Sequence, residues 1–166
     1  MKQLMARIHA QRGTEFQRAV VALFSDSSKF TLQANVKRLG KLRLQVGGQD
    51  LGDIDILVAD KLARRLLVIE CKNINPARTP YELHNEILDL TKDKPGKPSI
   101  IHRHEKRVIW ARNHFRPILV ALDLQDIEAW TIEPLIVTSE PHPATYSTHT
   151  TIPTVSIVQL KRCLET

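Results

Sequence analysis

Apolar residues recur at roughly helical spacing near the N-terminus, and polar residues separate them. The apolar positions are Leu4, Ile8, Phe16, Val20, Leu23 and Phe24. This periodicity predicts an amphipathic helix over residues 3–25, and Glu15 falls within it. Residues 29–36 then have the pattern of a strand, whereas residues 37–52 mix a hairpin pattern with a glycine-rich turn that the sequence does not resolve.

Two apolar runs rich in branched residues follow, Ile54 to Val58 and Leu66 to Lys72. A short polar segment joins them, which is typical of two strands connected by a turn. We therefore expect these two strands to form the centre of a sheet.

Two capping signals start the next elements. "TPYE" at residues 79–82 has a capping box with proline at the first helical position, which predicts a helix from Pro80 to about Leu90. Ser99 is placed to cap a second helix that ends near Pro117, and residues 118–124 continue it in either a helical or an extended form.

The C-terminal part predicts further sheet structure. Residues 130–140 have a strand pattern in which Pro134 indicates an edge or a bulge. Residues 154–158 predict a short strand, and the end of the chain is strand or helix. The order of elements is typical of a three-layer α/β domain with a mixed central sheet, and we expect residues 1–166 to form one domain.

Composition narrows the class of protein. With 166 residues and 42% apolar content, the chain can bury a sizeable core. Its start lacks the apolar segment of a secretory signal, and no apolar run is long enough to span a membrane, so we expect a soluble cytoplasmic protein. Only Cys71 and Cys163 occur, which favours neither a disulfide framework nor a cysteine zinc site.

Positive charge is concentrated near the N-terminus. The formal net charge is +6, and residues 1–50 hold nine Lys or Arg against three acids, so the first 50 residues carry the whole excess. Such a segment suits a phosphate-binding surface, although an ordinary solvated surface has the same composition. Aromatic residues make up only 5% of the chain, which favours a double-stranded substrate held through its phosphates over base stacking.

Charged residues also interrupt the two apolar strands. Glu70 and Lys72 share one face of their strand, about 6.6 Å apart along it. Asp53 and Asp55 share a face of the preceding strand, so strand pairing can bring a carboxylate beside Glu70. Two buried carboxylates that lie side by side require a neighbouring positive charge.

That charge can come from Lys72 alone or from a divalent ion as well. Mg²⁺ prefers oxygen ligands, and a half-open cage is available from Asp55, Glu70 and the backbone carbonyl of Cys71. Lys72 would then face the attacking water and the scissile phosphate, as metal-assisted hydrolysis requires. The alternative is an ion-pair network in which Lys72 neutralises Glu70 and no metal binds.

The segments "GDID" and "VIECKN" resemble the PD-(D/E)xK nuclease superfamily, and most closely its nuclease-related and Holliday-junction-resolvase-like members. The resemblance implies a restriction-endonuclease-like α-β-β-β-α-β core that cleaves nucleic acid with Mg²⁺ or Mn²⁺. It assigns Asp55 as the motif aspartate, Glu70 as the second acid and Lys72 as the motif lysine. It also implies that Glu15 in the first helix reaches the metal. The chain has Gly52 before Asp53 where the family name has proline, so Asp53 is the second choice for the ligand.

Several other residues are candidates for a functional role. His84, His102 and His104 lack ligand spacing and are expected at the surface. A basic run beyond Ser99 could either follow a phosphate backbone or form a soluble exterior with Ile101, Val108 and Ile109 turned toward the core. The basic run comprises His102, Arg103, Lys106, Arg107 and Arg112. Ser147 and His149 form no recognisable nucleophile motif.

The sequence thus predicts a metal-dependent hydrolase, a deoxyribonuclease whose partner is nucleic acid, with double-stranded DNA favoured. Endonuclease and exonuclease action both stay open, as do RNA as a substrate and a monomeric or dimeric state. The alternative is a catalytically silent nucleic-acid-binding or interaction module of the same fold, within a larger multidomain system.

Overall fold

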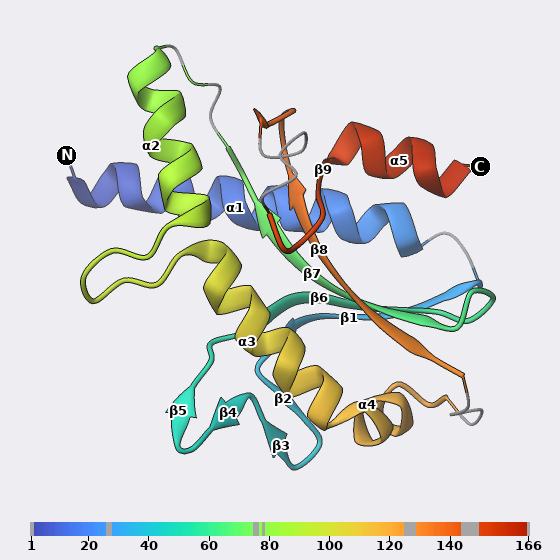
Figure 1. Cartoon of the computed structure of the whole chain (residues 1–166). Helices are drawn as coiled ribbons and strands as arrows, with labels where there is room; N and C mark the ends of the chain where they lie inside the picture. The colour runs from blue at the N-terminus through green and yellow to red at the C-terminus, as the bar shows by residue number, and fades with distance from the viewer. Residues whose placement is uncertain are drawn as a thin grey trace.

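A five-stranded mixed sheet runs through the middle of the molecule (Figure 1). Its strands, in spatial order, are β1 (Phe30–Val36), β6 (Ile54–Asp60), β7 (Arg65–Lys72), β8 (Thr131–Thr138) and β9 (Thr154–Ser156). β6 runs antiparallel to both of its neighbours, β1 and β7, whereas β8 and β9 run parallel to β7. The predicted central strands are confirmed, since β7 is the middle strand and β6 is its neighbour. The computed structural model describes residues 2–25, 28–74, 77, 79–124, 129–143 and 150–165.

Helices cover both faces of the sheet, so the molecule has three layers. One face packs against α1 (Lys2–Ser25) and α5 (Ile157–Glu165), and the other packs against α3 (Ile100–Asn113) and α4 (Phe115–Ala121). In Figure 1, α3 lies in front of the sheet and α1 lies behind it. The fold is therefore mixed α/β with a five-stranded mixed sheet, as the order of sequence patterns predicts. Among the helices of the described residues, none is long and apolar enough to cross a membrane.

The apolar periodicity of the first helix matches its packing. Phe16, Val20 and Phe24 are buried against the sheet, and Ile56 and Ile69 contribute to the same cluster. Burying a side chain of this size contributes about 1.5–3 kcal/mol, so the three α1 residues fix the helix to the sheet.

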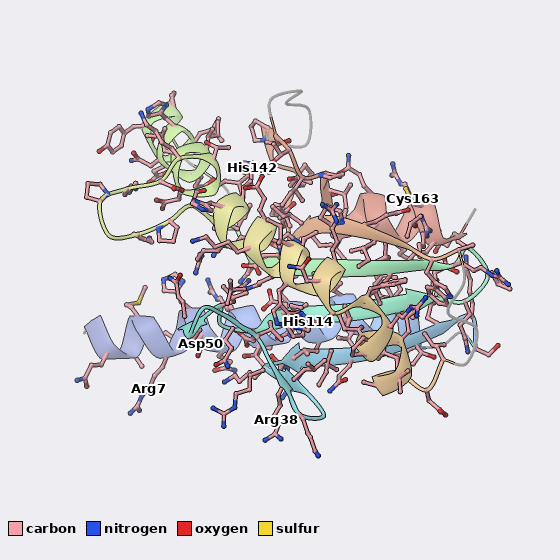
Figure 2. All side chains as sticks on the ribbon, turned by 60° about the horizontal axis from the view of Figure 1, so that its bottom comes forward. Arg7, Arg38, Asp50, His114, His142 and Cys163 are labelled. Carbon is pink, nitrogen blue, oxygen red and sulfur yellow. The ribbon has the colours of Figure 1, made fainter. Side chains whose placement is uncertain are left out.

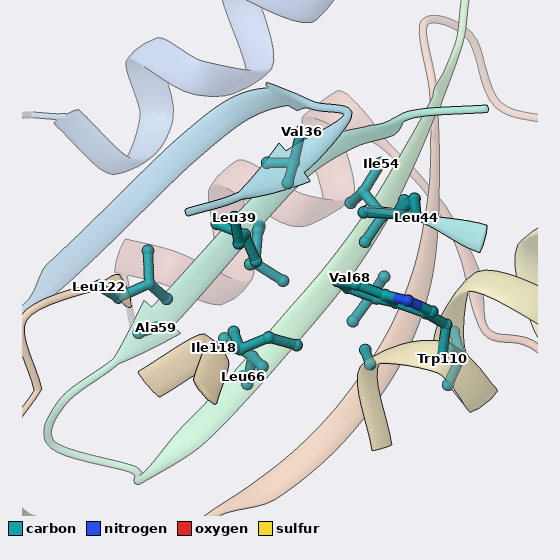
Figure 3. Packing of buried hydrophobic residues seen from close by; sticks show 13 residues of the cluster. Val36, Leu39, Leu44, Ile54, Ala59, Leu66, Val68, Trp110, Ile118 and Leu122 are labelled. Atoms are coloured by element: carbon teal, nitrogen blue, oxygen red, sulfur yellow. The ribbon is translucent and has the colours of Figure 1, made fainter. Parts of the chain in front are cut away.

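The segment that the sequence left unresolved forms two small hairpins. They pair β2 (Arg38–Leu39) with β3 (Leu42–Arg43), and β4 (Gln45–Val46) with β5 (Gln49–Asp50). Each hairpin is too short to be stable alone, so buried anchors must hold both of them. Leu39 and Leu44 provide these anchors beside Val36 and Ile54 in the cluster under α3 and α4 (Figure 3).

The predicted caps are present. Thr79 and Glu82 form both halves of the capping box of α2 (Pro80–Thr91), and the Ser99 hydroxyl accepts a hydrogen bond from the backbone N–H of His102 at the start of α3. The sequence left residues 118–124 either helical or extended. The structure makes them helical as far as Ala121, where α4 ends.

Two details near the C-terminus differ from or refine the prediction. Ile157 and Val158 belong to α5 rather than to the last strand, because Ser156 and Gln159 exchange hydrogen bonds as a capping box that starts the helix. Pro134 does lie at an edge. Its part of β8 pairs only with β7 among the described residues, since β9 joins from Ile136 onward.

On α3, two predicted orientations are wrong. Ile101 and Val108 are buried as expected, but Ile109 is 52% exposed. His104, expected at the surface, is fully buried, and its Nε2 lies 3.0 Å from the carbonyl oxygen of Val68. Burial lowers the pKa of His104 to about 4, so the ring is neutral at physiological pH. Ser147 and His149 lie outside the described residues.

Candidate active site

Strands β6 and β7 bring the two predicted carboxylates together. The antiparallel register that pairs Ile56 with Ile69 puts the next two residues, Asp55 and Glu70, side by side. The Asp55 carboxylate accepts a hydrogen bond through Oδ2 from the backbone N–H of Cys71 at 2.7 Å. Asp55 is half-buried and Glu70 is buried at 8% exposure, so little water is available to screen one charge from the other.

The pKa values of both carboxyl groups reflect this crowding. Burial and the negative charge of Glu70 raise the pKa of Asp55 to about 7, despite the opposing effects of the Cys71 N–H and Arg107. Burial also raises the pKa of Glu70, although Arg107, Lys72 and Arg103 lower it. A divalent cation between the two groups would relieve both the desolvation and the mutual repulsion.

Arg107 is the ion-pair partner of Glu70. Its Nη1 donates to Oε2 of Glu70 at 2.5 Å, and its Nε donates to the backbone carbonyl of Leu51 at 2.9 Å. The prediction that Arg107 lies in a phosphate-tracking or soluble face is wrong, because this side chain is buried at 6% exposure. The signal was present in the helical spacing, since Arg107 falls on the same stripe of α3 as His104 and Ala111, which are also buried.

Lys72 lies on the same face of β7 as Glu70, and it is half-buried. Its positive charge lowers the pKa of Glu70, but less than that of Arg107 does. Within the part of the chain that the structure describes, no carboxylate forms an ion pair with Lys72. The alternative interpretation of the sequence had Lys72 neutralise Glu70. In the structure, Arg107 is the residue that pairs directly with Glu70.

Asp53 lies outside the strand, in the short loop before β6. It is half-buried and borders a cavity lined by Lys37, Arg38 and Arg43. Its charge is the smallest of the influences that raise the pKa of Asp55. Of the two aspartates, Asp55 is therefore the one that the fold brings beside Glu70.

The first helix reaches the site through a residue that the sequence interpretation missed. Glu15 is exposed, and its carboxylate accepts a hydrogen bond from Gln11 at 2.8 Å. Gln17 instead donates from Nε2 to the backbone carbonyl of Asp55 at 2.6 Å. Gln17 adjoins the buried Phe16 and lies three residues before the buried Val20, a position on the sheet-facing side of α1 that could have identified it.

The donor set suits a hard divalent cation. Asp55 Oδ2 is bonded to Cys71 and Glu70 Oε2 to Arg107, whereas Oδ1 and Oε1 have no hydrogen-bond partner among the described atoms. The Cys71 N–H faces β6, since it donates to Asp55, and the C=O of the same strand residue faces the same side of β7. Two carboxylate oxygens and one carbonyl oxygen are therefore the atoms that could hold Mg²⁺, which prefers oxygen ligands.

Other potential ligand side chains do not gather around Asp55 and Glu70, or anywhere else in the ranges that the structure describes. No group of three or more His, Cys, Asp and Glu side chains is arranged there to hold an ion. His102 pairs with Asp93 at 2.6 Å, and His84 is exposed. Burial raises the pKa of the Cys71 thiol, so its sulfur is protonated and suits packing rather than ligation.

Comparison with known proteins identifies the family of the chain. A protein-family model described as "Anti-phage protein Upx-like" matches residues 5–161. The chain belongs to the Upx-like anti-phage protein family. The Upx-like match includes all five sheet strands and the residues Asp55, Glu70, Lys72 and Arg107, so the candidate site belongs to the family domain. Comparisons with curated proteins and with solved structures each found no match. The family suggests a role in defence and does not specify a reaction.

Proposed function

We propose that the chain is a metal-dependent nuclease that hydrolyses phosphodiester bonds of DNA, with invading phage DNA as the target in an anti-phage family. The observation that carries this proposal is the pair formed by Asp55 and Glu70, two crowded carboxylates with raised pKa values beside Lys72. Perturbed acids with a positive neighbour are typical of catalytic sites.

Each residue has a distinct role in this proposal. Asp55 and Glu70, together with the Cys71 carbonyl, would hold Mg²⁺ or Mn²⁺. When bound, the ion supplies a more acidic water and stabilises the charge that develops on the phosphate. Lys72 places its ammonium group on the same face, where it orients the attacking water or stabilises the phosphate charge. Gln17 supports the site by holding the backbone of Asp55.

The order of elements also supports the proposal. In the main sheet, α1 is followed by β1, β6 and β7, then by the three helices α2, α3 and α4, and then by β8, which runs parallel to β7. This order agrees with the restriction-endonuclease-like α-β-β-β-α-β core that the motif resemblance implies. The charged residues lie on its two most central strands, where rigid backbone can fix their positions.

The test compares two lysine variants in cleavage of supercoiled plasmid DNA with Mg²⁺ or Mn²⁺. We expect Lys72→Ala to abolish cleavage without a change in its thermal unfolding midpoint. Lys61→Ala, an exposed lysine in the β6–β7 turn, should cut like the unaltered protein. Undiminished cleavage by Lys72→Ala would remove the mechanism, and a parallel assay with RNA distinguishes the two nucleic acids.

One observation favours the second candidate, a catalytically silent module. Arg107 already neutralises Glu70 directly, so the site has one positive charge without any metal. Titration calorimetry with Mn²⁺ separates the two candidates, since the nuclease binds the ion through Asp55 and the silent module takes up none. Asp55→Asn is the matched control and should abolish Mn²⁺ uptake by the nuclease.

A further inference from the structure

We infer that the first small hairpin, together with Lys37 just before it, forms a phosphate-binding rim, which holds the backbone of a nucleic-acid duplex beside the candidate active site. The rim consists of Lys37, Arg38, Lys41 and Arg43, all of which are exposed. This inference rests on the proposed function and names the surface through which the substrate is held. Nothing in the sequence motif assigns a role to this segment.

The rim borders a cavity of about 450 Å³. Lys37, Arg38 and Arg43 contribute three positive charges to its lining, and Asp50 and Asp53 contribute two negative ones. Arg38 is held in place at the first hairpin, since its Nε and Nη2 donate to the Gly40 carbonyl at 3.1 and 3.0 Å. Figure 2 shows Arg38 projecting away from the sheet.

A short segment of the chain connects the cavity to the candidate active site. Gly52 and Asp53 line the cavity, and Asp55 follows two residues later on β6. In the same segment, the Leu51 carbonyl accepts a hydrogen bond from Arg107, which also binds Glu70. A phosphate bound at the rim would therefore lie close to the segment that carries Asp55.

The chemistry of the rim favours a phosphate backbone over other anionic partners. A DNA duplex presents one negative charge per about 1.7 Å of its axis, so several adjacent cations can each neutralise a phosphate. The rim has no aromatic side chain on which bases could stack, which favours a duplex over a single strand. An acidic protein is the competing partner, and the experiment below includes it.

The experiment measures binding of a fluorescent DNA duplex by anisotropy without divalent ions, so that binding is separated from cleavage. The rim variant combines Lys37→Gln, Arg38→Gln and Arg43→Gln. The matched control combines Lys61→Gln, Arg116→Gln and Lys161→Gln, which removes the same charge from exposed positions outside the rim. We expect the slope of log affinity against log salt to fall by about three in the rim variant and to stay unchanged in the control.

Further arms exclude a folding defect and a different partner. The variant Arg38→Lys with Arg43→Lys keeps the charge and should keep the slope. Equal slopes in the rim variant and the control would overturn the inference. Tighter binding of polyglutamate than of the duplex, lost in the rim variant, would also overturn it, because the rim would then recognise acidic protein.

Failure of the rim and failure of the proposed function give different results. The rim variant should take up Mn²⁺ like the unaltered protein, because none of its three residues lies at the carboxylate pair. Duplex binding that depends on the rim, in a chain that takes up no Mn²⁺, would support the rim and reject the nuclease. Mn²⁺ uptake with rim-independent duplex binding would reject the rim alone.

Discussion

Arg107 and Glu70 form a nearly dry ion pair, in which the two side chains are 7% and 10% exposed and their bonded atoms are 2.5 Å apart. The pair connects α3 to β7, and Arg107 extends it to the loop at Leu51. It supplies the positive charge that Glu70 needs in the absence of metal. It also fixes one oxygen of Glu70 and leaves the other for a ligand.

Loss of Arg107 should destabilise the fold. We expect Arg107→Met to lower the free energy of unfolding by about 3 kcal/mol, because it leaves the Glu70 charge buried without a partner. Urea denaturation measures this, with the exposed Arg112→Met as control. The double variant Arg107→Met with Glu70→Met should regain most of the loss, since no uncompensated charge stays buried. A single-variant loss no larger than that of the control would contradict the pair's role.

Asp55 should give the protein a distinctive pH dependence. Its pKa is about 7 in the fold against 3.8 for an ordinary aspartate side chain, so between these values the folded state holds a proton that the unfolded state has released. The contribution of Asp55 is then fully present below about pH 4 and is lost as pH rises through 7. Relative to Asp55→Asn, the unaltered protein should lose roughly 2 kcal/mol from pH 4 to pH 8, less than the full shift because Asp55 is only half-buried.

Asp60 is the matched control for this titration. The N–H of Ala63, together with Arg65 and Lys29, lowers the pKa of its carboxyl group. Its contribution is therefore present above about pH 4 and is lost as pH falls below that value. The stability of the unaltered protein relative to Asp60→Asn should therefore fall as the pH is lowered. Its stability relative to Asp55→Asn should instead fall as the pH is raised. A flat difference for Asp55→Asn across the range would contradict its crowded setting.

The contacts of α1 predict different effects for two of its residues. We expect Gln17→Ala to lower the free energy of unfolding by about 1 kcal/mol, the worth of its hydrogen bond to the Asp55 carbonyl. The exposed Glu15→Ala should change it by less than about 0.5 kcal/mol. Chemical denaturation checks both. If Glu15→Ala abolished Mn²⁺ uptake, Glu15 would act on the metal as the motif resemblance implies.

Gly52 should resist substitution because of its backbone conformation and because of its closeness to Arg107. Gly40 separates these two effects, since it shares only the backbone conformation. Its φ is +77°, and an added Cβ would lie 3.0 Å from Nη2 of Arg107, whereas Gly40 has a φ of +57° and open space. Gly40→Ala should cost about 1 kcal/mol from backbone strain alone. Gly52→Ala should cost about 1 kcal/mol more, and that excess should vanish in an Arg107→Met background. Thermal and urea unfolding of the four variants measure it, and equal costs at the two glycines would remove the contact.

The residues of the carboxylate pair could be predicted because strand geometry is local. Alternation along "IDIL" and "VIECK" assigns faces from neighbouring residues alone, and two successive strands joined by a short turn pair with each other. Capping boxes are equally local, so the start of α2 was predicted correctly. The Ser156–Gln159 box has the same signature, but the branched residues on either side of Ser156 also match a strand pattern, so the sequence predicts a strand there.

The hairpins were harder because each has only two residues per strand. Such strands have too little alternation to show a period. Their position depends on Leu39 and Leu44 entering a core made by distant parts of the chain, including Trp110. The segment's charges were visible in the sequence, but their arrangement around one cavity was not.

By itself, the sequence determined the three-layer α/β class, the central strands, and Asp55, Glu70 and Lys72 as the charges set into them, because each depends on neighbouring residues. Only the tertiary structure decided which cation meets Glu70 and which α1 side chain reaches Asp55. Arg107 lies 37 residues from Glu70, and Gln17 lies 38 residues from Asp55. Contacts over such separations are set by how α1 and α3 pack on the sheet, which no local pattern records.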